Sequence, residues 1–198
     1  MIPFYKPRFF DRLGPAVELG RSFICPEYQK SYAPLLLLWK GITRFVLRHP
    51  VAASLFGAVS ISRDYQEASR GLIASFLLDR TSHDLARLVQ PRIKYRGAAA
   101  GAVRRMAAAA ASIEDLSLPI SDIESDGKGV PVLLRQYLKA GGRLLGLNVD
   151  PHFRDVVDAL ILTDLRAAPP ALLERCIGRV EAKSFLEWHS SQDLPAAV

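Results

Sequence analysis

Residues 54–61, SLFGAVSI, are the stretch that decides the fold class. A short, largely apolar run of this kind is typical of a buried β-strand. Residues 64–67, DYQE, follow it with an aspartate and, three positions later, a glutamate, which resembles a capping box at a helix start. We therefore expect a helix over 64–78. A strand that leads directly into a helix is the repeating unit of an α/β layer.

The residues before this stretch also predict a strand followed by a helix. Residues 16–25 carry Val17, Leu19, Phe23 and Ile24 and predict a strand, and a polar loop follows over 26–32. A helix is expected from Ala33, because a proline in the second position is tolerated in the first helical turn. His49-Pro50 ends it. The order strand–helix–strand–helix predicts an α/β fold.

The helix expected over 33–49 has two different faces. Its apolar positions recur at helical spacing and are expected to face the core: Leu35, Leu38, Ile42, Phe45 and Val46. Lys40, Arg44 and Arg48 are spaced four residues apart on another face. This basic stripe is either a solvated surface or a docking surface for an acidic carrier protein or for anionic lipid headgroups.

The rest of the chain contains further elements and one unusual segment. Residues 1–15 predict an irregular lead-in, and residues 80–118 a basic, alanine-rich and partly helical excursion. Beyond it we expect a helix over 130–140, strands over 143–149 and 156–165, and a helix over 170–189. The chain is thus organised as a domain over 1–190 with a short tail over 191–198.

Composition narrows the function classes. The chain is 49% hydrophobic, which excludes global disorder, and its net charge of +6 favours anionic partners. Cys25 and Cys176 stand far apart and predict neither a disulfide framework nor a metal site, which suits a cytoplasmic protein. No apolar run is long enough to cross a bilayer, although the chain can lie on the inner membrane surface. No nucleic-acid-binding motif is present.

Three strings of residues resemble one enzyme family. They are residues 18–42, with ELGRS, PEY and LLWKGI; residues 56–65, with FGAVSIS and DY; and residues 126–151, with DGKGVPVLLRQYL, GGRLLG and NVDP. They are similar to GNAT-type acyltransferases of the branch that holds ornithine-lipid N-acyltransferases and hemolysin-annotated acyltransferases. The resemblance implies transfer of a fatty acyl group from an acyl-carrier-protein or coenzyme A thioester to an amine, in aminolipid synthesis, with no bound cofactor.

The resemblance also implies a partial fold. In the GNAT order β1-α1-α2-β2-β3-β4-α3-β5-α4-β6-β7, residues 16–25 match β4, 33–49 match α3 and 54–61 match β5. Residues 64–78 match α4, and 143–149 and 156–165 match β6 and β7. We therefore expect a GNAT-like mixed sheet with flanking helices that lacks the first strands. Such a sheet exposes an edge, so we expect a homo-oligomer or a partner chain that supplies the missing half.

The same family implies the site residues. Glu18 and Arg21 match its Glu-x-x-Arg pair near the acceptor and carrier sites, where Glu18 either deprotonates the amine or forms a structural ion pair. The donor is expected at the loop before the helix: Phe23, Ile24, Gln29, Lys30, Ser31, Tyr32 and Ala33. This loop lacks the usual glycines, which suits a single phosphopantetheine phosphate better than a diphosphate.

Several other polar residues leave alternatives open. Asp122, Glu124 and Asp126 form either a polar loop or an acceptor-ammonium site, and they lack the calcium-loop pattern. His152 is either a base or a solvated turn residue, and Ser60 lacks a nucleophile-elbow motif. At the level of the whole chain, the alternative to an enzyme is a non-catalytic module that binds a carrier protein or a membrane.

Overall fold

The structure contains the helices and strands that the sequence predicts, together with further short elements. The computed structural model describes residues 4–20, 22, 24–28, 31, 33–97 and 101–192. The helices are α1 (Phe9–Leu13), α2 (Ala33–Arg48), α3 (Glu67–Arg80), α4 (Gly101–Ala109), α5 (Ser117–Ile123), α6 (Val132–Lys139), α7 (Pro170–Ile177) and α8 (Arg179–Gln192). The strands are β1 (Phe4–Tyr5), β2 (Ala16–Glu18), β3 (Ser54–Ile61), β4 (Val89–Gln90), β5 (Arg143–Asp150) and β6 (Val156–Asp164).

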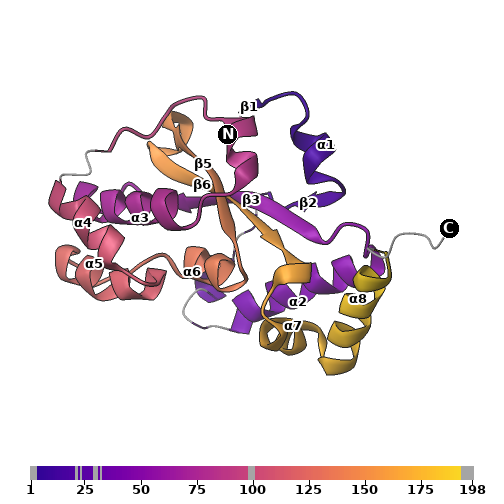
Figure 1. Ribbon diagram of the computed structural model, residues 1–198. Coiled ribbons are helices and arrows are strands. Elements are labelled where there is room, and N and C mark those ends of the chain that lie inside the picture. Colours follow the sequence, from indigo (N-terminus) through magenta and orange to yellow (C-terminus); the bar gives the residue numbers. More distant parts are fainter. Residues whose placement is uncertain are drawn as a thin grey trace.

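A mixed sheet in the order β2-β3-β6-β5 forms the centre of the molecule (Figure 1). β2 and β3 are parallel, and the connection between them contains α2. β6 lies antiparallel to both β3 and β5, so the last strand in sequence is inserted between two earlier ones. A register shift between Leu144 and Gly146 interrupts the β5–β6 ladder. The α/β class expected from the sequence is confirmed.

Most helices pack on one face of this sheet. β3 directs Leu55, Val59 and Ile61 to that face, where they join the main hydrophobic core with α2, α3 and α6. Successive strand residues point to opposite faces, so these alternate positions form one apolar surface. α3 is buried along most of its length because it contacts the sheet on one side and α4 and α5 on another.

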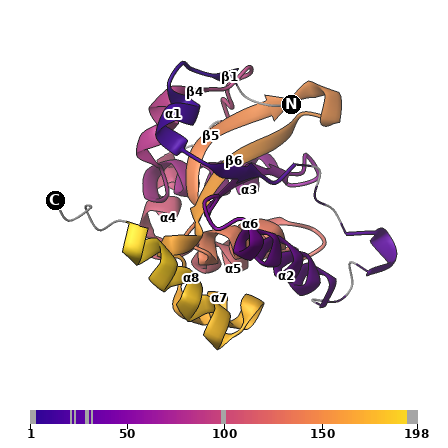
Figure 2. The same ribbon diagram turned by 90° about the vertical axis from the view of Figure 1, so that its right-hand side faces the viewer.

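A second, smaller core covers part of the opposite face. Phe9 on α1 is fully buried there against Phe56, in a cluster with Leu85, Val89, Leu145, Leu160 and Leu162. β1 pairs antiparallel with β4 and lies over the same face (Figure 2). Residues 4–13 are therefore not the irregular lead-in that the sequence predicts. Tyr5 and Phe9 have a sheet face to cover, which no local pattern reveals.

The excursion over 80–118 is built from packed short elements. A 3₁₀ segment (Asp84–Leu88) and β4 contribute to the second core, and α4 packs on α3 through the fully buried Ala107. The small side chain of Ala107 permits this close approach of two helices. Arg104 and Arg105 remain exposed.

The largest differences from the predicted boundaries concern three elements. β2 ends at Glu18 instead of 25, and the helix expected over 170–189 is two helices, because Gly178 has a φ of 94° between them. α3 begins at Glu67 instead of 64. The Asp64 carboxylate accepts a hydrogen bond from Ser62 Oγ (2.8 Å), and Glu124 accepts the Gln66 N–H (2.9 Å), so the helix start is capped from another segment.

The face of α2 that meets the core is also different in detail. Leu35, Trp39, Thr43 and Val46 are its buried residues, whereas Phe45 is 48% exposed. Thr43 can be buried because its Oγ1 donates to the Trp39 carbonyl (2.9 Å). Lys40, Arg44 and Arg48 are exposed, as their spacing predicts.

Candidate functional site

The parallel strands β2 and β3 separate after a short paired segment. Ala16, Val17 and Glu18 pair with residues 54–56, and the Leu19 N–H then donates to the Phe56 carbonyl (2.7 Å). β3 continues to Ile61, whereas the chain after Leu19 leaves the sheet towards the 3₁₀ segment Pro26–Tyr28 and α2 (Figure 2). The divergence leaves an opening beside the second half of β3.

Gly57 allows the two strands to approach closely just before they separate. A Cβ atom at Gly57 would lie 2.5 Å from the Leu19 carbonyl oxygen and 3.2 Å from the Leu19 Cβ atom. Any side chain would therefore collide with backbone, which cannot swing aside as a flexible side chain can. A glycine is required at this position to place Leu19 against β3.

Backbone groups of β3 face the opening. Along a strand, the backbone N–H and C=O groups of every second residue point to the same neighbouring strand. The Phe56 carbonyl points towards β2, so the backbone groups of Ala58 and Ser60 point to that side as well. Within the residues that the structure describes, no backbone hydrogen bond joins Ala58 or Ser60 to the β2 side of the sheet. The Ala58 amide is the first beyond the last pairing, and it can donate to a ligand oxygen.

A cavity of about 450 Å³ occupies this divergence. Its lining comes from the chain after β2, from β3, from the end of β5 and the turn that follows it, from β6 and from α6. The lining residues are Leu19, Ser22, Ala58, Ser60, Leu133, Tyr137, Asp150, Phe153, Val156 and Asp158. Apolar and acidic side chains thus share one cavity, a combination that is common in ligand sites.

Asp158 is the chemically most distinctive residue of the cavity. It lies opposite Ser60 in the β3–β6 register, and its Oδ1 accepts a hydrogen bond from Ser60 Oγ (2.6 Å). Its side chain is only 7% exposed, and burial raises the pKa of the carboxyl group, an effect that the hydrogen bond from Ser60 opposes. Among the described residues, no lysine, arginine or histidine forms an ion pair with Asp158.

A buried carboxylate that forms no ion pair with the described lysine, arginine and histidine side chains is poised to bind a cation or a proton. Taking a charge out of water is costly unless an opposite charge compensates for it. An ammonium group that enters the cavity would supply that charge. The raised pKa also brings the carboxyl group closer to the range in which a group exchanges protons at neutral pH.

Two further residues complete the polar part of the cavity. Asp150 is buried at the end of β5. Its Oδ1 accepts a hydrogen bond from the backbone N–H of His152 (2.9 Å) and caps the 3₁₀ turn Pro151–Phe153. Tyr137 on α6 packs against Trp39, with ring centroids 5.1 Å apart, and burial raises the pKa of its phenol to about 12. The phenol therefore stays protonated at neutral pH and can donate a hydrogen bond.

The site residues expected from the sequence lie mostly outside this cavity or outside the described residues. Glu18 is exposed on β2, and it adds to the effect of burial in raising the pKa of Tyr5 to about 12, so it lies on the α1 side. Ile24 packs against the main core, and Ser31 and Ala33 are exposed near the start of α2. Arg21, Phe23, Gln29, Lys30 and Tyr32 lie outside the described residues.

The acidic loop before α6 has a structural role. Glu124 is buried, accepts the Gln66 N–H and lies 3.7 Å from Lys128 Nζ, while Asp126 lies 3.3 Å from the same nitrogen. These contacts join the loop to the start of α3. His152 is exposed in its turn. In the part of the chain that the structure covers, no three histidine, cysteine or acidic side chains gather as a metal site.

Sequence reasoning missed Asp158 and dismissed Ser60. The available signal is an aspartate at the third position of the largely apolar run VVDALILTDL. The sequence pattern does not indicate which residue contacts Asp158, because Ser60 and Asp158 are 98 positions apart in the chain.

Comparison with known proteins gives a distant similarity in sequence. No protein-family model and no solved structure matches it. A glycine N(alpha)-acyltransferase of Bacteroides thetaiotaomicron is 26% identical over 186 residues, which cover 89% of this chain and 53% of that protein. The chain thus spans about half the length of this curated relative. No helix of the described residues is long and apolar enough to cross a membrane. The chain is a distant homologue of an N-acyltransferase.

Proposed function

We propose that this chain carries the acyl-transfer site of an N-acyltransferase, which moves an acyl group from a thioester to a primary amine. The observation that carries the proposal is the buried carboxylate of Asp158 inside the cavity where β2 and β3 separate. The name of the similar protein supports an amino acid as acceptor and glycine as the first to test. That the whole protein is an N-acyltransferase is part of the same proposal.

The strand order supports a GNAT-like fold for this site. The chain order β2, α2, β3, α3, β5, β6 follows the β4-α3-β5-α4-β6-β7 order of that fold. In GNAT enzymes the divergence of β4 from β5 admits the pantetheine arm of the donor. The opening between β2 and β3 is the corresponding place here. We infer that the donor is a thioester of acyl carrier protein or coenzyme A.

The proposed reaction begins with the acceptor. A primary amine is an ammonium ion at neutral pH and must lose a proton before it can attack. The carboxylate of Asp158 binds the ammonium and accepts this proton, which then leaves to solvent. Ser60 holds Asp158 in position through its hydrogen bond. The buried Asp150 lines the same cavity.

Acyl transfer then needs no covalent enzyme intermediate. The amine nitrogen attacks the thioester carbonyl carbon, a C–N bond forms, and the carbonyl oxygen becomes an oxyanion. The Ala58 N–H, which faces the opening, stabilises the oxyanion as a preorganised donor. As the C–S bond breaks, the nitrogen loses its second proton and the departing sulfur gains one. The products are an amide and a free thiol.

The test is a product assay with the full chain. The chain is incubated with palmitoyl-acyl-carrier protein or palmitoyl-coenzyme A and with glycine, ornithine or another amino acid. Mass spectrometry then looks for the N-palmitoyl product. We expect a product with at least one amine. Binding of the thioester without any product would instead support the non-catalytic alternative.

Two residues compete for the role of base, and one pair of variants separates them. If Asp158 is the base, Asp158→Asn loses turnover and Glu18→Gln keeps it. If Glu18 is the base, as the family resemblance implies, the outcome is reversed. Each substitution removes one carboxylate charge and preserves shape, so the two variants control for each other.

A further inference from the structure

The exposed face of α2 combines unpaired basic groups with large apolar side chains. Lys40, Arg44 and Arg48 are exposed, and within the described residues none of them takes part in a salt bridge. On the same helix Leu37 is 67% and Phe45 is 48% exposed. The sequence of α2, APLLLLWKGITRFVLR, contains no acidic residue.

These residues share one side of the helix. At about 3.6 residues per turn, positions 37, 40, 44, 45 and 48 fall within an arc of about 140°. Leu37, Arg44 and Arg48 lie near the middle of the arc, and Lys40 and Phe45 lie at its two sides. We call these five residues the α2 surface. A basic helix face with exposed apolar side chains is the pattern of helices that lie on membranes.

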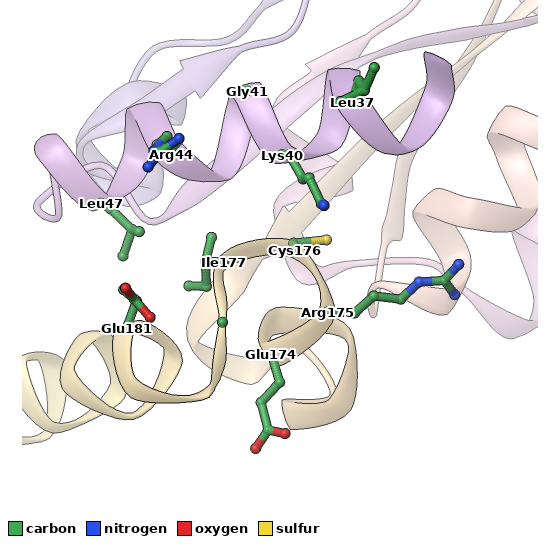
Figure 3. A pocket seen from close by; sticks show the side chains of 11 residues that line it. Leu37, Lys40, Gly41, Arg44, Leu47, Glu174, Arg175, Cys176, Ile177 and Glu181 are labelled. Atoms are coloured by element: carbon green, nitrogen blue, oxygen red, sulfur yellow. The ribbon is translucent and has the colours of Figure 1, made fainter. Parts of the chain in front are cut away.

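A groove of about 590 Å³ runs along one side of the α2 surface (Figure 3). Leu37, Lys40 and Arg44 line it from α2, and the opposite wall comes from the end of α7 and the start of α8. Two acids of that wall line the groove, Glu174 and Glu181, and Glu174 lies 3.6 Å from Arg179 Nε. Among the described residues, no ion pair joins either acid to Lys40 or Arg44 across the groove.

We propose that the α2 surface binds an anionic lipid bilayer. The cations attract the negative surface potential, and Leu37 and Phe45 enter the boundary between headgroups and acyl chains. An acidic protein could pair with the basic side chains equally well, but it would not explain why the apolar side chains of Leu37 and Phe45 are exposed beside them. The three positive charges are spread along the helix, which suits the evenly distributed negative charge of a bilayer surface. The proposal does not depend on acyl transfer.

The experiment measures binding of the full chain to vesicles by co-sedimentation at low and physiological ionic strength. We expect binding to vesicles of equal parts phosphatidylglycerol and phosphatidylcholine, and little binding to phosphatidylcholine alone. Each basic residue near the surface contributes about a factor of five, so Arg44→Gln combined with Arg48→Gln should weaken binding about 30-fold. Added salt should weaken binding of the unaltered chain.

A matched variant removes the same charge elsewhere. Arg104→Gln combined with Arg105→Gln changes two exposed arginines of α4, and it should reduce binding much less. Leu37→Ser combined with Phe45→Ser keeps all charges and should still weaken binding. Equal loss in the α4 variant, or an unaltered chain that ignores anionic vesicles, would overturn the proposal. So would an α2 surface that captures purified acyl carrier protein while vesicles stay unbound.

Discussion

Ser60 on β3 donates a hydrogen bond of 2.6 Å to Asp158, the residue directly opposite it on β6. The pair lies in the cavity at the β2–β3 divergence, where Asp158 is buried and has no ion-pair partner among the described basic side chains. A hydroxyl donor fixes the orientation of the carboxylate but does not neutralise it. Asp158 thus keeps its capacity to bind an ammonium group.

Asp158→Asn should lower kcat about 100-fold or more, because general-base catalysis contributes about 10²- to 10⁴-fold. The thioester KM should change little, since the substitution preserves shape. Steady-state kinetics on the product assay give both constants. Asp79→Asn, at an exposed position near the end of α3, is the matched control and should keep full activity. Activity of Asp158→Asn within twofold of the unaltered chain would remove Asp158 from the mechanism.

The raised pKa of Asp158 should make the protein less stable as pH rises. Burial raises the pKa in the folded state above the ordinary value of about 3.9 in the unfolded chain. Between these two values the folded protein binds more protons than the unfolded chain, so the free energy of unfolding falls with increasing pH. The free energies of unfolding of the unaltered chain and of Asp158→Asn, measured by urea denaturation, should be equal near pH 3.

The stability difference in favour of Asp158→Asn should then grow from about pH 4 and level off above the folded pKa. A constant difference at all pH values would mean that the asparagine acts through packing and not through charge.

Gly57→Ala should destabilise the fold and disturb the cavity. The added Cβ would lie 2.5 Å from the Leu19 carbonyl oxygen, so backbone must move. Overpacking of this kind costs about 1–3 kcal/mol. Thermal unfolding should show the loss, and the thioester KM should rise because Leu19 lines the cavity. Gly41→Ala is the control: the exposed α2 site has nothing within 4 Å, and alanine should stabilise the helix by about 1 kcal/mol.

Phe9→Ala should test whether residues 4–13 are an integral part of the domain. Phe9 is fully buried in the second core, whereas its neighbour Phe10 is 55% exposed. Removal of a buried phenylalanine costs about 3–5 kcal/mol. Denaturant unfolding should show a much smaller loss for Phe10→Ala. Similar small losses in both variants would mean that α1 is not firmly packed on the sheet.

Local sequence patterns determined the elements whose structure depends on near neighbours. The strand over 54–61 was predicted with its observed bounds, and α2 differs from its expected range by one residue at its end. An apolar run between turns, and a helical repeat closed by His49-Pro50, suffice for these. The basic stripe of α2 was also predicted, because residues four apart share a helix face whatever the fold.

Tertiary structure decided everything that depends on residues distant in sequence. β2 ends at Glu18 because the chain crosses β3 at Gly57, and the apolar residues up to 25 gave no sign of this. The buried Phe9 needed a sheet face made by later strands. Asp158 became a site residue only when the β3–β6 register placed Ser60 opposite it. Side-chain periodicity is a property of one segment, whereas register, strand divergence and the burial of a carboxylate arise only when segments meet.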